Sequence, residues 1–121
     1  MRIVLVGALN GAMAVGLGAF AAHGLEGQFA MANAELFNVA VFYQALHAVT
    51  LVALGALRSE LYRPVVDTAA WAFLAGLVLF CGSLYAKGLN PDWVLPYVTP
   101  LGGGAFIAGW LLLAVAAARR I

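Results

Sequence analysis

The sequence predicts an all-α membrane protein, a compact bundle of four transmembrane helices with both termini in the cytoplasm. Of its 121 residues, 65% are hydrophobic and only 9% are charged, whereas a soluble domain carries about 25% charged residues. Four apolar stretches are long enough to cross ~30 Å of hydrocarbon, which takes roughly 20 helical residues. These stretches are continuous and rich in alanine and leucine, which favours helices over the alternating strands of a membrane barrel.

The first span is expected at residues 3–22, where small side chains follow two neighbouring faces of the helix. Gly7, Gly11 and Gly18 share one face, and Ala8, Ala12 and Gly16 form the other stripe. Small residues let helices approach closely in lipid, so we expect tight helix packing here. Residues 19–21 (AFA) also resemble a signal-peptide cleavage site, but the apolar run is long for a signal core, and we expect it to remain as a span.

Asn10 interrupts this first apolar run. A buried amide needs hydrogen-bond partners, because hydrocarbon supplies none. We expect Asn10 to bond across to another helix, and a ligand-binding role is the alternative.

The second span is expected at residues 36–57 and contains the polar side chains that lie deepest in the membrane. Tyr43, Gln44 and His47 share one helical face, because they are three and four residues apart. The preceding segment, residues 25–34, is mildly amphipathic. It is expected either to lie along the membrane interface as a short helix or to extend the second helix.

The third span is expected at residues 67–85, and signals at its start support a helix there. Pro64 and Asp67 suit a first helical turn, where a missing N–H is tolerated and a negative charge is favoured. The single cysteine, Cys81, lies inside this span, and we expect it to be a small packing residue.

The fourth span is expected at residues 100–118. Thr99 followed by Pro100 is typical of a helix cap and first turn. Gly104 and Gly109 are expected to allow a close helix crossing. The alternative is that free amides at residues 102–104 hold a lipid phosphate.

The positions of the basic residues predict how the protein is oriented. Those on the side of the two termini are Arg2, Arg58, Arg63, Arg119 and Arg120, and Lys87 is the one on the other side. Because basic loops stay inside the cell, both termini are expected in the cytoplasm. The net charge of only +1 leaves no basic face, which excludes electrostatic binding of nucleic acid.

The two histidines are the strongest candidates for chemistry. His47 lies near the middle of the second span, where an ionisable group is either functional or a neutral side chain satisfied by its neighbours; both interpretations stay open. His23 ends the first span, where we expect it to cap the helix, with a metal, haem or quinone contact as the alternative. Because the two lie at different depths, they are not expected to share one haem or metal ion.

No arrangement typical of a catalytic centre occurs in the sequence. It contains no Gly-x-Ser-x-Gly motif, no paired cysteine or histidine ligands at metal-binding spacing, and no carboxylate within a span. We therefore expect no enzymatic activity, no metal and no cofactor, with haem as the alternative.

Four ordered motifs resemble those of a known family. They are residues 18–25 (GAFAAHGL), 43–48 (YQALHA), 80–85 (FCGSLY) and 99–110 (TPLGGGAFIAGW). Together they are similar to the YgdD-like small inner-membrane proteins, a domain-of-unknown-function family with relatives in animal mitochondria, over essentially the whole chain. Ala21 stands where that family usually has glycine and Cys81 where it usually has serine, and both remain small. The resemblance implies four spans and an inner-membrane location, and it implies no established activity or catalytic residue.

In the predicted topology the polar residues of these motifs gather toward the outer half of the bundle. We expect one polar cluster there, made of His23, Tyr43, Gln44, His47, Ser83, Tyr85 and Thr99. The expected function is that of a non-enzymatic accessory or assembly subunit, or a lipid-binding module, which contacts membrane lipids, other membrane proteins or further copies of itself. The alternatives are a redox or haem-linked component that uses His47 or His23, and a small transporter or channel.

Overall fold

The computed structural model describes residues 2–24 and 33–119, and within these ranges all regular structure is helical. The long helices are α1 (Ile3–Gly24), α2 (Ala34–Leu57), α3 (Arg63–Gly76), α4 (Gly82–Leu89) and α5 (Val98–Ala118). The short helices are η1 (Arg58–Glu60), η2 (Leu77–Cys81) and η3 (Pro91–Trp93). Because η2 is a π-helical turn that joins α3 to α4, four segments are long and apolar enough to cross a membrane. The predicted all-α fold with four spans is confirmed.

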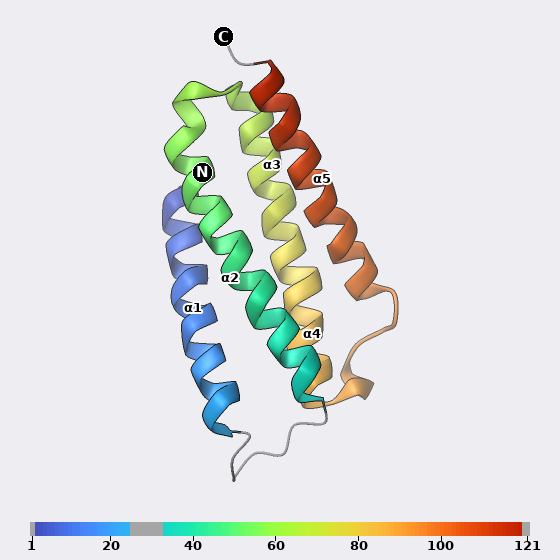
Figure 1. Cartoon of the computed structure of the whole chain (residues 1–121). Helices are drawn as coiled ribbons and strands as arrows, with labels where there is room; N and C mark the ends of the chain where they lie inside the picture. The colour runs from blue at the N-terminus through green and yellow to red at the C-terminus, as the bar shows by residue number, and fades with distance from the viewer. Residues whose placement is uncertain (1, 25–32, 120–121) are drawn as a thin grey trace.

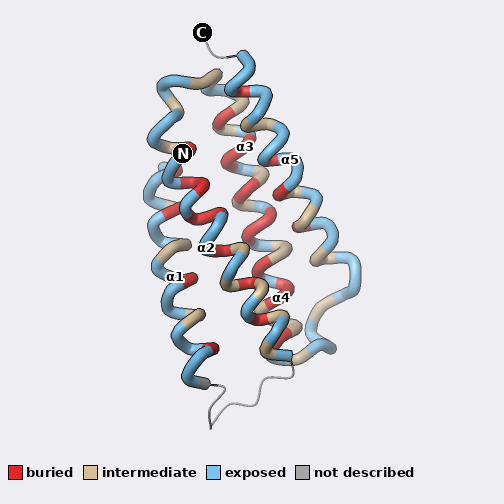
Figure 2. Tube along the Cα trace, in the orientation of Figure 1, coloured by how far each residue is buried: buried red, intermediate tan, exposed pale blue. Residues whose placement is uncertain are grey.

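The helices lie side by side, with α1 at one edge and α5 at the other (Figure 1). α1 packs mainly against α2, whereas α5 packs against α3 and η2, and α2 also packs against α4. The burial pattern follows from this order (Figure 2). In the two central spans 39% of the most apolar stretch is buried, against 17% for α1 and 22% for α5. The start of α1 and the end of α5 lie at the same end of the molecule.

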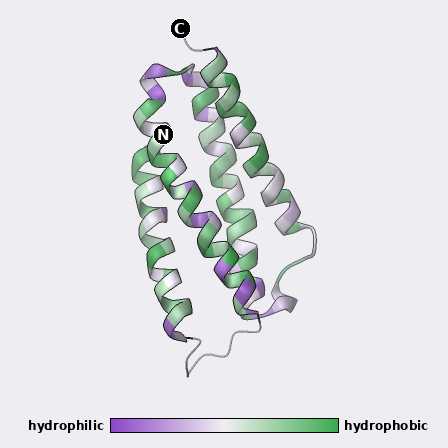
Figure 3. Cartoon of the chain, viewed as in Figure 1, coloured by the Kyte–Doolittle hydropathy of each residue, from purple (hydrophilic) through white to green (hydrophobic). Residues whose placement is uncertain are grey.

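Most of the helical residues are hydrophobic, and hydrophilic residues occur at the ends of the helices and at a few positions along α2 (Figure 3). At the end with the termini, Arg58 donates two hydrogen bonds of 2.7 Å to the carboxylate of Asp67. This bidentate ion pair joins the end of α2 to the first turns of α3. At the opposite end, the side chain of Asn33 caps α2, and its backbone N–H donates to the carbonyl of Gly88 on α4. Both connections therefore fasten the second span to the third.

Two expectations about helix starts need correction or qualification. The expected capping role of Thr99 is wrong, because α5 begins at Val98, two residues before the expected start at residue 100. The Thr99 hydroxyl bonds to side chains of α4 instead. The third span begins at Arg63, before the expected residue 67, because Pro64 fits the first turn. Of the segment expected at the interface, residues 25–32 lie outside the described residues, and Ala34 already belongs to α2.

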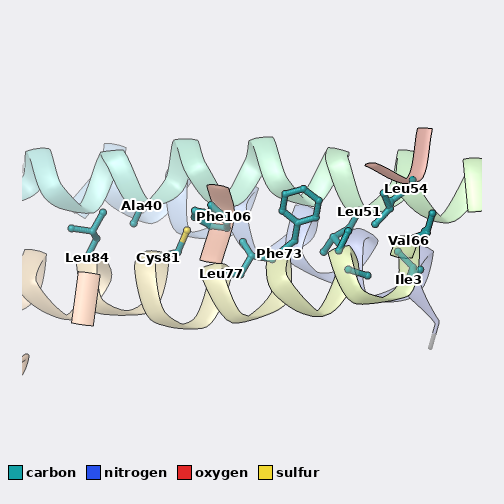
Figure 4. Close-up of a cluster of buried hydrophobic side chains, with 13 residues drawn as sticks. Ile3, Ala40, Leu51, Leu54, Val66, Phe73, Leu77, Cys81, Leu84 and Phe106 are labelled. Atoms are coloured by element: carbon teal, nitrogen blue, oxygen red, sulfur yellow. The ribbon is translucent and has the colours of Figure 1, made fainter. Parts of the chain in front are cut away.

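The hydrophobic core runs along the contact between α2, the third span and α5 (Figure 4). Its largest side chains include Phe73, Phe106, Leu51, Leu54 and Leu77. Cys81 is also buried in this core, where it lies between Phe106 and Leu84 (Figure 4).

Glycine positions decide how closely these helices approach. A Cβ added at Gly7 would lie 2.9 Å from the carbonyl oxygen of Ala48, and one at Gly109 would lie 2.7 Å from the ring of Phe73. Gly11 and Gly18 have looser neighbours on α2, at 3.9 and 3.2 Å. The expected close contact at Gly104 is wrong, because this residue faces open space. Besides Gly109, Gly102 makes a close approach on α5, because it lies against the backbone of Phe80.

Gly7→Ala and Gly16→Ala form a matched pair that tests the contact between α1 and α2. Alanine favours a helix over glycine by up to about 1 kcal/mol at either site. At Gly7 the added methyl group meets the backbone of α2, whereas at Gly16 it meets nothing within 4 Å. We expect Gly7→Ala to lower the free energy of unfolding by about 1–3 kcal/mol and Gly16→Ala to leave it unchanged or higher. Thermal unfolding in detergent measures both, and equal effects would contradict the packing described above.

Candidate functional site

Gln44 is buried at the centre of a hydrogen-bond network that joins three helices. Its Nε2 donates to Oδ1 of Asn10 on α1 over 3.1 Å, and its Oε1 accepts from the hydroxyl of Tyr85 on α4. The Asn10 amide in turn donates to the carbonyl of Val6 on its own helix at 2.9 Å. The chain of donors therefore runs from α4 through α2 to α1, and we call it the Gln44 network.

Neighbouring side chains hold both ends of the Gln44 network in place. Asn10 lies between Gly7 and Gly11 in the sequence, on the part of α1 that contacts α2. Tyr85 is held by Phe37, whose ring meets it edge-on with centroids 4.8 Å apart. Asn10 therefore bonds across to another helix, as expected, and its partner is Gln44.

His47, which is 2% exposed, has hydrogen bonds at both ring nitrogens. Nδ1 lies 2.8 Å from the carbonyl oxygen of Tyr43, and Nε2 lies 3.1 Å from the indole nitrogen of Trp110. A carbonyl only accepts and an indole N–H only donates, so Nδ1 must carry the proton and Nε2 must accept. His47 is therefore a neutral imidazole with one defined tautomer, and neither nitrogen is free for a metal or haem iron.

Aromatic rings surround His47. The ring of Phe106 on α5 stacks on the imidazole, with centroids 3.7 Å apart and planes 9° apart. Phe73 lies at 5.6 Å and Trp110 at 6.0 Å from the imidazole, and Tyr43 stacks at 6.2 Å. These contacts come from three different spans, so His47 acts as a packing centre between α2, α3 and α5.

A second chain of hydrogen bonds links α4 to the start of α5. Ser83 Oγ donates to the Phe80 carbonyl over 3.0 Å and lies 2.6 Å from the Thr99 hydroxyl. Lys87 Nζ donates to the same Thr99 hydroxyl at 3.0 Å. Since Ser83 uses its proton on Phe80, Thr99 donates to Ser83 and accepts from Lys87, which gives every hydroxyl a donor and an acceptor.

The residues expected to form one polar cluster thus separate into three hydrogen-bonded groups. Gln44 and Tyr85 belong to the Gln44 network, His47 pairs with Trp110, and Ser83 and Thr99 belong to the Lys87 chain. Tyr43 contributes its backbone carbonyl and its ring face. His23 is exposed at the end of α1 and makes no side-chain hydrogen bond to any described residue.

Three residues make side-chain contacts that were not predicted from the sequence. The role of Trp110 could not be predicted, because nothing in the sequence pairs its indole with His47. Lys87 was expected only as a loop charge. Asp67 was expected to favour a helix start, but it pairs with Arg58, and opposite charges nine residues apart across a short turn were a signal for that pair.

The buried polar side chains of these groups are engaged in hydrogen bonds within the fold. Within the described residues no group of three or more histidine, cysteine, aspartate or glutamate side chains lies close enough to hold a metal ion. Every buried side-chain nitrogen or oxygen in the described ranges has a hydrogen-bond partner. In this fold the polar side chains join neighbouring helices by hydrogen bonds.

Comparison with known proteins places the chain among membrane proteins without an assigned activity. Residues 17–103 match the family described as "Protein of unknown function (DUF423)". The chain is 42% identical to "UPF0382 membrane protein YwdK" of Bacillus subtilis, over 98% of this chain and 97% of that protein. It is 42% identical to "UPF0382 membrane protein SERP0230" of Staphylococcus epidermidis, over 93% of this chain and 92% of that protein. No solved structure is detectably similar.

Gln44→Leu tests whether the Gln44 network stabilises the fold. The substitution leaves Oδ1 of Asn10 without its donor and the Tyr85 hydroxyl without its acceptor. We therefore expect the free energy of unfolding to fall by about 1–3 kcal/mol. Thr50→Val is the control on the same helix, because Thr50 bonds only to the carbonyl of Leu46. In a double-mutant cycle, Gln44→Leu with Tyr85→Phe should cost less than the sum of the single changes. Strict additivity would show that the two side chains do not interact.

Nitrogen NMR of the two histidines tests the assigned tautomer of His47. We expect a protonated Nδ1 and an unprotonated Nε2 in the wild-type protein. Trp110→Phe removes the indole donor, so the Nε2 resonance should shift while the signals of exposed His23 stay in place as an internal reference. A protonated Nε2 would contradict the assignment. So would a histidine-ligated haem spectrum that appears on adding haemin and is lost in His47→Ala.

Proposed function

Since this chain belongs to the DUF423 family of proteins of unknown function, we propose its role from its surfaces. It is a non-enzymatic accessory or assembly subunit that binds a transmembrane helix of another membrane protein through the outer face of α1. The observation that carries this proposal is an exposed stripe of small residues on the least buried span.

α1 has two small-residue faces, and only one is used within the chain. Gly7 lies tightly against α2, whereas Ala8, Ala12 and Gly16 are all exposed. A Cβ at Gly16 would meet nothing within 4 Å. Residues spaced four apart form a continuous shallow groove along a helix, and small-xxx-small patterns of this kind favour close helix association in lipid. The outer stripe is therefore suited to a second helix.

Two observations favour this function over a redox component or a transporter. Both ring nitrogens of His47 are occupied by hydrogen bonds, which leaves no lone pair directed at a haem iron. In the described spans the carboxylates of Glu35, Glu60 and Asp67 stand near helix ends, and that of Asp67 is paired with Arg58. Ion-coupled transporters usually carry acidic groups deeper in the membrane.

We propose an orientation with both termini on the cytoplasmic side of a bacterial inner membrane. Four described arginines lie toward the end with the termini, and Lys87 lies toward the other end. This asymmetry is what the positive-inside rule associates with the cytoplasm. The finer kinship with the YgdD-like proteins is supported by the four motifs of the sequence and belongs to the same proposal.

Gly16→Leu and Gly82→Leu are a matched pair that tests the stripe. Both glycines face open space, so neither leucine disturbs the fold, and the unfolding midpoints of both variants should match the wild type. We expect the tagged wild-type protein and Gly82→Leu to migrate in one discrete complex on native gels of solubilised membranes. Gly16→Leu should release the protein from that complex.

Two results would contradict this function. One is a wild-type protein that migrates alone, and the other is a Gly16→Leu complex of unchanged size. Co-expression of two differently tagged copies, followed by mass spectrometry of the complex, shows whether the partner is a second copy of the chain or another membrane protein.

A further inference from the structure

An apolar groove lies between α2 and α5 on the surface that faces the membrane. Leu46, Val49, Ala53 and Leu57 line it from α2, and Trp110 and Leu113 line it from α5. Its volume is about 220 Å³. We call it the α2–α5 groove.

The groove offers hydrocarbon contacts and no hydrogen-bonding group to a ligand. The Trp110 nitrogen points inward to His47, so the indole presents only carbon atoms to the groove. The one hydroxyl in the wall, that of Thr50, donates to the carbonyl of Leu46 at 2.8 Å. A ligand held here must therefore be an apolar chain.

The length of the groove matches one leaflet of a bilayer. From Leu46 to Leu57 an α-helix rises ~16 Å, at 1.5 Å per residue, and half of the hydrocarbon thickness is about 15 Å. One end of the groove is then near the midplane, beside Trp110, and the other end is at the membrane surface, beside Leu57.

Two arginines follow the ends of the helices that line the groove. Arg58 follows Leu57 directly, and Arg119 follows the last turn of α5. Arg58 is paired with Asp67, whereas Arg119 has no carboxylate partner among the described residues. Its guanidinium lies 4.5 Å from the centre of the Tyr62 ring, in the connection between α2 and α3. Arg119 and Leu57 therefore lie at the same end of the bundle, where the groove reaches the membrane surface (Figure 1).

We propose that the α2–α5 groove binds one acyl chain of an anionic phospholipid, with the lipid phosphate at Arg119. The apolar walls select a hydrocarbon chain, their length selects a chain of one leaflet, and the unpaired arginine selects a negative headgroup. This site is separate from the small-residue stripe on α1, so the proposed lipid site can be tested independently of the proposed function.

Native mass spectrometry of the detergent-purified protein tests this site. The probes are dioleoylphosphatidylglycerol and dioleoylphosphatidylcholine, which have the same chains and differ in headgroup charge. We expect the wild-type protein to retain the anionic lipid about fivefold more than the neutral one, as a single arginine at the membrane surface would give. Equal retention of the two lipids would overturn the proposal.

Two matched pairs of variants locate the lipid. Ala53→Phe fills the groove and should abolish retention of both lipids, whereas Ala56→Phe, on an exposed position of α2 outside the groove, should not. Arg119→Gln should reduce retention of the anionic lipid to the level of the neutral one, whereas Arg2→Gln, which removes the same charge just before α1, should preserve the preference. Unchanged binding in Ala53→Phe, or equal losses in the two arginine variants, would overturn the site.

Discussion

A side-chain amide inside a membrane has no water to bond to, and Gln44 meets this constraint by joining three helices. Its carbonyl end accepts from Tyr85 and its amide end donates to Asn10. α1 packs mainly on α2, with Gly7 in close contact with the backbone of α2. The directional bond to Asn10 also favours one register, because a shift would leave polar groups of two amides unsatisfied in hydrocarbon. The register of α1 on α2 therefore depends on Gln44 as well as on close packing.

The same constraint shapes the surroundings of His47. Its neutral form has one donor and one acceptor, and the fold supplies Tyr43 and Trp110 as their partners. The stacked ring of Phe106 reaches the imidazole because Gly76 leaves room for it, and Gly109 leaves room for Phe73 in the same way. The hydrogen bonds of His47 and the glycines around it therefore depend on each other. The bonds form only where the helices lie close together, and the glycines leave room for the aromatic rings between these helices.

Much of the fold could be predicted from the sequence, and much of the site could not. The number of spans follows from hydropathy and segment length, because both are set by the thickness of the bilayer. The cross-helix bond of Asn10 follows from the cost of burying an amide. The separation of the polar residues into three groups depends on how the helices are paired and rotated. Spacing within one helix carries no information on that, so Trp110 could not be matched to His47. Likewise Thr99 satisfies the rule for a cap but finds better partners in Ser83 and Lys87.

Because the buried polar groups of the described spans are used within the fold, the recognition that we propose takes place on apolar surfaces. The hydrophobic effect gives no specificity there, since lipid tails are as apolar as leucine. Two other sources of specificity remain in a membrane, namely close shape complementarity and charge at the headgroup level. The exposed stripe with Gly16 offers the first, and the groove offers the second because it ends at the end of the bundle that carries Arg119. A chain with so few charged residues can thus be selective, provided that its cations stand at helix ends and some of its small residues, such as Gly16, face outward.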